Sequence, residues 1–282
     1  MNQRKSLKEL NLLDKFLFDE AMDDPENVKT MLDIILSQNT NLKQSPQTEK
    51  EQRTSTDNRQ IRLDVYAIDE DDVIYEVEAQ KENTHNLPKR SRLYQGIIDS
   101  KLLPPGVVDF NLLNEVLIVL IMPFDLFGYG LYRYTFQMKC QEIPELKLDD
   151  GATRIFLNTK GKHPESVSPE LIELLKYMEH STDEVSEACE SKRIQEMHRR
   201  VCQIRASEKT EVKYMQSWEE RIMIKQEGIA EGRIEGEKAL LKSLIEKKMA
   251  KKYSAEQISA MLEVDVSEVE NIMKEIQNEK YL

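Results

Sequence analysis

The sequence has few cysteines and lacks the usual zinc-binding pattern. Its 282 residues include only three cysteines, Cys140, Cys189 and Cys202. Three scattered thiols are too few for the disulfide framework of a small secreted protein. Cys189 and Cys202 combine with His198 as a mixed set of thiols and imidazole, but the short Cys-x-x-Cys pairs that are typical of zinc sites are missing. We therefore interpret the thiols as buried or idle.

Long apolar segments are also missing. No run approaches the roughly 20 apolar residues that span a bilayer. The longest run, Val116 to Met122, has the length of a strand. The first residues lead into an amphipathic stretch, which is not typical of a secretory signal. These absences predict a cytoplasmic protein that does not bind a membrane.

An excess of positive charge is absent as well. The chain has 52 Asp and Glu against 40 Lys and Arg, which gives a net charge of -12. This argues against a protein that binds nucleic acid simply because it is basic. It does not exclude a nucleic-acid enzyme, because such enzymes gather cations along one face and need acidic residues at the metal. The four histidines form no pattern with a serine or cysteine nucleophile, so triad chemistry has no support.

Apolar periodicity divides the chain into a mixed part and a helical part. Two helices are predicted within 7–36, and Asp24 and Pro25 mark the start of the second. The polar run 37–60 is interpreted as an exposed loop. A helix is predicted from Leu87 to about Ser100, and helical spacing continues from Ser168 to about Ile245. Strands are predicted at 61–68, 73–80, 112–122, 131–138 and 154–158.

These patterns predict three segments. Residues 1–160 mix helices and strands around one sheet, as in a layered α/β domain. Residues 161–245 form a helical extension, and 246–282 form a small helical hairpin resembling a helix-turn-helix. Gly228, Gly232 and Gly236 recur every four residues, which suits close packing in a dimer or a pliant helix. A homo-oligomer through the C-terminal helices is one expectation.

The stretch from Ile61 to Gln80 is the most informative part of the sequence. Two alternating runs, separated by the acidic segment Asp69 to Asp72, predict an antiparallel hairpin. Strands usually contain few acidic residues. Asp64, Glu76 and Glu78 nevertheless lie within these runs, and their presence requires a reason.

The register of this hairpin provides one. The turn lacks the Gly that a two-residue hairpin prefers, which favours a longer loop with Asp69 opposite Val73. Asp64 then lies directly opposite Glu78 on the same face. Facing like charges destabilise a pair of strands, so the pair needs a cation. Two carboxylates with phosphate oxygens and waters suit Mg²⁺. The alternative is a surface hairpin with solvated acids.

The helix after the hairpin begins with cations. Lys89, Arg90 and Arg92 gather near its N-terminus, away from its apolar stripe. Two interpretations remain open, a surface that faces phosphates and a solvated charged face.

Several motifs occur in the order found in one known family. They are Asp64, the sequence Glu78-Ala79-Gln80, the helix from Lys89 to Gly96, the connector Phe124 to Gly128 and the opening helix Leu12 to Phe18. Together they resemble the PD-(D/E)XK nuclease family transposases, the recombination-promoting nuclease group. The resemblance covers about residues 7–160 and, more loosely, the helical remainder.

The resemblance implies a restriction-endonuclease-like α/β fold, a mixed central sheet flanked by helices, with an all-helical C-terminal extension. It also implies a DNA endonuclease connected with recombination or mobile DNA that depends on Mg²⁺, with Mn²⁺ as a substitute. By position, Asp64 and Glu78 are the metal carboxylates, and Gln80 stands where the wider superfamily has lysine. Asp14 is a candidate for an additional acidic ligand or a base acting through water.

Further residues are assigned to the substrate. Tyr94 and Gln95 are candidates to position the phosphate or a water, and Arg62, Lys89 and Arg90 are candidates to contact phosphates. Two departures from the family pattern stand out. Leu63 replaces the proline of the family name, which carries no catalytic group. Gln80 replaces a lysine, and a neutral amide lacks the charge that lowers the pKa of the attacking water.

The substitution at Gln80 leaves alternatives open. A nearby cation such as Arg62 or Arg90 supplies the missing charge, or the chain is a weakly active or inactive DNA-binding protein on the same fold. A third reading is an assembly module that acts through its C-terminal helices.

Overall fold

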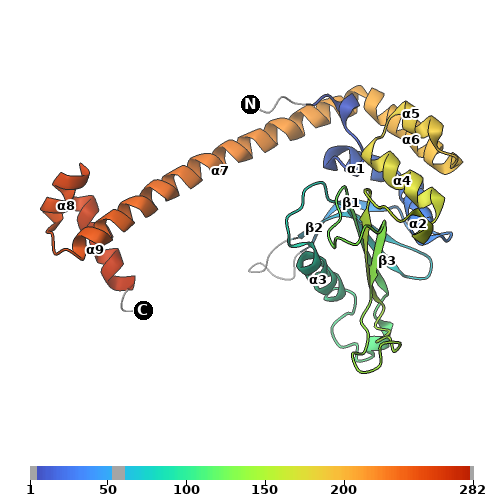
Figure 1. The fold of residues 1–282 in the computed structure, drawn as a ribbon, viewed down its shortest axis with the longest axis horizontal. Coiled ribbons are helices and arrows are strands. Elements are labelled where there is room, and N and C mark those ends of the chain that lie inside the picture. Colours follow the sequence, from blue (N-terminus) through green and yellow to red (C-terminus); the bar gives the residue numbers. More distant parts are fainter. Residues whose placement is uncertain (1–4, 53–60, 280–282) are drawn as a thin grey trace. The chain divides into compact units, whose positions relative to one another are not determined.

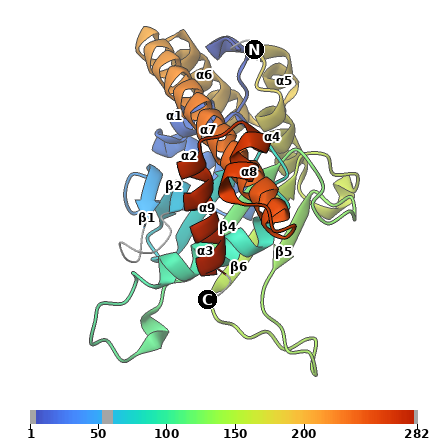
Figure 2. The same cartoon turned by 90° about the vertical axis from the view of Figure 1, so that its left-hand side faces the viewer.

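A mixed β-sheet forms the core of the first part of the protein (Figure 1). The computed structural model describes residues 5–52 and 61–279. Within these residues, six strands form one sheet in the order β1-β2-β3-β4-β6-β5, with β1 and β5 at its edges (Figure 2). The strands are β1 (Gln47–Gln52), β2 (Ile61–Ile68), β3 (Ile74–Ala79), β4 (Val116–Met122), β5 (Arg133–Phe136) and β6 (Ala152–Asn158).

The central strands are parallel and the outer ones antiparallel. β3, β4 and β6 run parallel, while β1 with β2, β2 with β3, and β5 with β6 are antiparallel. The sequence of β4, Val-Leu-Ile-Val-Leu-Ile-Met, is apolar throughout. A strand covered on both faces needs such a run, and β4 is accordingly buried along almost its whole length.

Helices cover both faces of the sheet. One face packs against α3 (Leu87–Asp99) through Leu87, Tyr94, Ile97 and Ile98. The opposite face packs against a larger helical layer, and Figure 1 shows α3 apart from α2 and α4. That layer contains α1 (Lys15–Met22), α2 (Pro25–Leu36), α4 (Pro169–Glu179), α5 (Asp183–Ala188) and α6 (Lys192–Ala206). Three short 3₁₀ helices complete the described part of this unit, η1 (Leu7–Glu9), η2 (Phe110–Leu112) and η3 (Pro164–Ser166).

This arrangement confirms the α/β fold that the resemblance implies. The predicted start of α2 is also confirmed, since the Asp24 side chain accepts a hydrogen bond from the Glu26 amide at 3.0 Å and Pro25 opens the helix. The loop predicted at 37–60 is wrong in part, because Gln47–Gln52 form the edge strand β1. Its Gln-Thr-Glu-Lys-Glu-Gln sequence lacks the apolar alternation of a half-buried strand, and it pairs with β2 through its backbone. Residues 53–60 of that loop lie outside the described part of the chain.

By their packing, the residues divide into two units, Met1–Tyr214 and Met215–Leu282. The long helix α7 (Glu208–Met249) begins in the first unit and ends in the second. In the second unit its last turns pack with α8 (Ala255–Leu262) and α9 (Val266–Glu279) around an apolar cluster. Ser254 and Gln257 form a capping box at the start of α8, in which the hydroxyl of Ser254 accepts from the Gln257 amide and the Gln257 side chain accepts from the Ser254 amide. The cluster consists of Ile245, Ile258, Val269 and Ile276.

The middle of α7 is largely exposed. A Cβ atom added at Gly228, Gly232 or Gly236 would meet nothing within 4 Å. Several apolar side chains of the helix are also exposed: Val212, Met215, Met223, Ile224, Ile229, Ile234 and Leu240. Across the described residues, no helix has the length and apolar character needed to cross a membrane.

Candidate active site

The hairpin of β2 and β3 has the register that the sequence predicted. Its paired residues run from Ile68 with Ile74 to Val65 with Val77, and the Asp69 amide donates to the Val73 carbonyl at 3.1 Å. One step further, this register sets Asp64 opposite Glu78. At that point the ladder between the two strands has ended, and β2 continues its pairing with β1 while β3 continues with β4. The two acidic side chains therefore lie where the strands part.

Three buried carboxylates occupy this point. Asp64 and Glu78 are 6% and 8% exposed, and Glu76 is 0% exposed. Glu76 and Glu78 are two residues apart on β3 and share a face of the strand. Both carboxylate oxygens of Glu76 and the Oε2 of Glu78 are buried without a hydrogen-bond partner among the described residues. Unpartnered buried acids are costly, and a cation among these oxygens would offset that cost.

Burial and mutual repulsion change the acidity of these groups. Burial raises the pKa of Glu76 well above its usual range, and the charges of Glu78 and Asp64 raise it further. Burial also raises the pKa of Glu78 to about 7, although Arg90 acts in the opposite direction. The pKa of Asp64 is raised by burial and lowered in part by Lys15. Burial thus raises the pKa of all three carboxyl groups, and a cation beside them acts in the opposite direction.

Each facing acid receives one cation from a different helix. From α1, Lys15 Nζ lies 2.6 Å from Asp64 Oδ1 and 3.1 Å from Asp19 Oδ2. From α3, Arg90 Nη2 lies 2.6 Å from Glu78 Oε1. Since α1 and α3 cover opposite faces of the sheet, the acids are held between the two helical layers.

Arg90 also contacts Gln80, the residue that is predicted to replace a lysine. Its Nη2 atom donates to Gln80 Oε1 at 2.5 Å, next to the bond that it makes to Glu78. Gln80 also donates through its Nε2 atom to the Glu82 carbonyl. The neutral amide therefore lies beside a guanidinium group, which brings a positive charge to this position.

A basic surface pocket adjoins the carboxylates. It has a volume of about 390 Å³ and includes four of the five residues that the sequence assigned to the substrate, Arg62, Lys89, Arg90 and Tyr94. Its remaining lining residues are Ile61, Asn86 and Leu93. Arg90 belongs both to this pocket and to the acidic site. Three cations around one pocket suit a phosphate group.

The other assigned residues have different surroundings. Gln95 is buried, and its Nε2 atom donates to Asp99 Oδ1 at 2.9 Å; it does not line the basic pocket. Asp14 precedes α1, forms an ion pair with Lys81 and accepts a hydrogen bond from the Asn11 amide at 3.0 Å. The α1 carboxylate that shares Lys15 with Asp64 is Asp19. Burial raises the pKa of Asp19 to about 7.

Sequence reasoning assigned no role to three residues of the site. Glu76 could have been assigned from the sequence. Residues two apart on a strand lie on the same face, so Glu76 shares the face of Glu78. Lys15 and Asp19 are four residues apart on one helix, which makes them neighbours. Nothing in the spacing shows that α1 carries this pair to Asp64.

The donor set fits a hard divalent cation. Carboxylate oxygens are the ligands that Mg²⁺ and Mn²⁺ prefer in proteins. The orphaned oxygens of Glu76 and Glu78 are buried, so a cation among them would remove an electrostatic cost that the protein otherwise bears.

Comparison with known proteins decides the family. The chain matches the family model of the PD-(D/E)XK nuclease family transposases over residues 15–227. The protein belongs to this family. No curated protein and no solved structure matches it. The family description indicates a nuclease-type function with DNA as the substrate. The matched residues of this PD-(D/E)XK chain include the carboxylates and the basic pocket, whereas Asp14 lies one residue before the match.

Proposed function

We propose that the protein is a Mg²⁺-dependent DNA endonuclease associated with recombination or mobile DNA, with Mn²⁺ as a substitute. The observation that carries this proposal is the convergence of three buried carboxylates, Asp64, Glu76 and Glu78, with orphaned oxygens beside a basic pocket. Family membership supplies the reaction class, the hydrolysis of phosphodiester bonds.

Asp64 and Glu78 are the residues that would hold the metal, and Glu76 lies deepest beside them. When bound, a divalent cation polarises the phosphodiester and lowers the pKa of a coordinated water. Lys15 favours the ionised form of Asp64 against the effect of burial, because an adjacent cation stabilises the charged form of a carboxyl group. Burial and the neighbouring acids favour the protonated form of Glu76 in the metal-free protein, since both raise its pKa.

Arg90 has the central role among the basic residues. It lies against Glu78 and Gln80 and lines the pocket where a phosphate fits. From there it stabilises the negative charge that develops on the phosphate during attack. Lys89 and Arg62 hold neighbouring phosphates of the DNA strand, a contact that fixes position without reading sequence.

Nicking of a supercoiled plasmid tests the proposal. We expect cleavage in Mg²⁺ or Mn²⁺ that stops with EDTA and is abolished by Asp64→Asn and by Glu78→Gln. Asp71→Asn is the matched control, because Asp71 is an exposed acid in the turn of the same hairpin. Cleavage that persists in both site variants and in EDTA would rule the proposal out.

One observation favours a second candidate, a DNA-binding protein with little or no catalysis. Lys15 and Arg90 already neutralise Asp64 and Glu78 without a metal, and Gln80 lacks the usual charge. Calorimetric titration with Mn²⁺ separates the two. A binding heat that disappears in Asp64→Asn supports the nuclease, and its absence from the unaltered protein supports the second candidate.

A further inference from the structure

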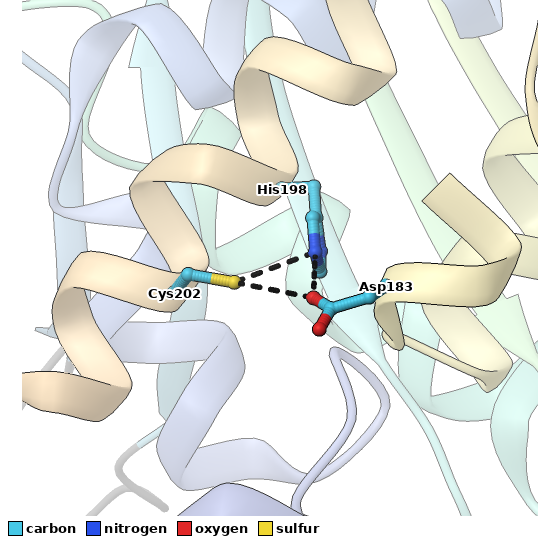
Figure 3. Close-up of side chains that lie close together, drawn as sticks. All are labelled: Asp183, His198 and Cys202. Atoms are coloured by element: carbon cyan, nitrogen blue, oxygen red, sulfur yellow. Dashed lines mark hydrogen bonds and ion pairs between the residues drawn. The ribbon is translucent and has the colours of Figure 1, made fainter. Parts of the chain in front are cut away.

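A second group of potential metal ligands lies far along the chain from the carboxylates. Asp183 is the first residue of α5, while His198 and Cys202 lie four residues apart, one turn along α6. Figure 3 shows their side chains pointing toward one another. His198 Nε2 lies 2.7 Å from Asp183 Oδ1 and 3.4 Å from Cys202 Sγ, and the sulfur lies 3.9 Å from the same carboxylate oxygen. All three residues belong to the first unit.

We propose that Asp183, His198 and Cys202 form a transition-metal site that takes Zn²⁺, separate from the Mg²⁺ site proposed above. Imidazole, thiolate and carboxylate are the ligands that zinc prefers, whereas magnesium takes oxygen ligands. Three protein ligands with water in the fourth position are a known zinc arrangement. The metal would join α5 to α6.

The geometry argues against a nucleophilic Cys-His-Asp relay. In such a relay, the nucleophile and the acid use different nitrogens of the imidazole. Here the carboxylate and the thiol both approach Nε2 of His198. Burial and the charge of Asp183 also raise the pKa of the Cys202 thiol, whereas a reactive thiol needs a lowered pKa. A metal ion accounts for three ligands that converge on one point.

The other nitrogen of the imidazole has the partner that a metal-binding histidine requires. His198 Nδ1 lies 3.0 Å from the hydroxyl of Tyr177, a residue that is 0% exposed. Metal-binding histidines usually donate the second ring N–H to a carboxylate, carbonyl or water oxygen, which fixes the tautomer and the ring orientation, and the Tyr177 hydroxyl oxygen can accept in the same way. With Nε2 bound to zinc, Nδ1–H donates to the Tyr177 oxygen.

The spacings fit a tetrahedral site after one small movement. Zinc bonds of about 2.0–2.3 Å set neighbouring ligand atoms roughly 3.3–3.6 Å apart. The sulfur lies at 3.4 and 3.9 Å from its neighbours, close to this range. The 2.7 Å contact is a hydrogen bond that must open when the metal enters. The Asp183 side chain is 81% exposed and can move without disturbing the core.

Cobalt spectroscopy of the full-length, metal-stripped protein tests the site. A Co²⁺–thiolate bond gives a charge-transfer band in the near ultraviolet, and we expect this band on addition of Co²⁺ and its displacement by Zn²⁺. Cys202→Ser should abolish the band, while Cys140→Ser, which alters another partly exposed thiol, should retain it. Asp64→Asn should also retain it, which separates this site from the proposed nuclease site. Absence of the band, or its persistence in Cys202→Ser, would overturn the proposal.

Two measurements do not depend on the folding of a ligand variant. Zn²⁺ should slow alkylation of Cys202 in the unaltered protein, read by peptide mass spectrometry, and leave that of Cys140 unchanged. Tyr177→Phe keeps the ring but removes the hydrogen-bond partner, and it should weaken Zn²⁺ binding by about 10-fold or more. Equal protection of both thiols, or unchanged binding in Tyr177→Phe, would count against the site.

Discussion

The guanidinium group of Arg90 lies 2.6 Å from the carboxylate of Glu78. The same nitrogen lies 2.5 Å from the amide oxygen of Gln80. One arginine on α3 therefore joins an acid of the proposed metal site to the residue that the sequence comparison predicts to stand in place of a lysine. The arginine therefore supplies a positive charge next to the carboxylate of Glu78 from a helix that packs on the sheet.

This relationship predicts the effect of changing Arg90. Arg90→Met should lower the rate of plasmid nicking by about 10²-fold, because it removes a donor that stabilises developing negative charge. Arg90→Lys should lower the nicking rate by a smaller factor. Lysine keeps the positive charge, although it lacks the planar guanidinium group. The matched control is Arg92→Met, an exposed cation on the same helix outside the pocket. Equal nicking rates for Arg90→Met and Arg92→Met would contradict the assignment.

The raised pKa of Glu78 predicts a stability that falls with pH in the metal-free protein. Its pKa rises from 4.5 to about 7 on folding because the carboxyl group is buried. The folded state then binds more protons than the unfolded state, so the contribution of this group is fully present below pH 4.5 and lost as the pH rises to about 7. Urea unfolding in EDTA at pH 5 and at pH 8 measures this loss.

Glu78→Gln provides the control for this measurement. It removes the titrating group, so the decline between these two pH values should become smaller. Added Mg²⁺ should restore stability at pH 8, because a ligand that binds only the folded state stabilises it. A decline of unchanged size in Glu78→Gln would show that another group titrates.

The raised pKa of Glu76 predicts that the protein releases protons when it binds a metal ion. Its pKa is raised well above the usual range by burial and by the neighbouring acids, and a bound cation would reverse this effect. Calorimetry of Mn²⁺ binding in buffers of different ionisation enthalpy should therefore show net proton release near neutral pH.

Glu76→Gln should reduce that release and weaken Mn²⁺ binding. Its free energy of unfolding without metal should be higher than that of the original protein at neutral pH, because glutamine resembles a protonated glutamate in shape and charge but does not have to take up a proton on folding. A large loss of stability would show instead that Glu76 is ionised in the metal-free protein.

Local rules were sufficient for much of the fold and for part of the site. The odd-length turn could be predicted because the segment from Asp69 to Asp72 lacks glycine, and that turn fixes the register of β2 with β3 as far as Val65 opposite Val77. The apolar run of β4 and the caps of α2 and α8 follow from equally local patterns. In each case, the deciding information lies within about a dozen neighbouring residues.

What could not be predicted depends on contacts between distant segments. β1 has an entirely polar sequence, and its structure comes from backbone pairing with β2. Lys15 reaches Asp64 across 49 positions of the chain. Asp183 joins His198 and Cys202 only because α5 packs against α6, so a search for closely spaced cysteines could not find the group.

The glycines of α7 predict a gain of stability on substitution. Each costs a helix roughly 1 kcal/mol relative to alanine, and an added Cβ at Gly228, Gly232 or Gly236 would meet nothing within 4 Å. We therefore expect each Gly→Ala change to stabilise the helix by about 1 kcal/mol, measured by hydrogen exchange of the α7 amides. Gly161→Ala is the contrasting control, because its Cβ would lie 2.3 Å from the Tyr132 ring. If the three glycines instead pack against a second copy, the triple substitution should lower the mass measured by light scattering.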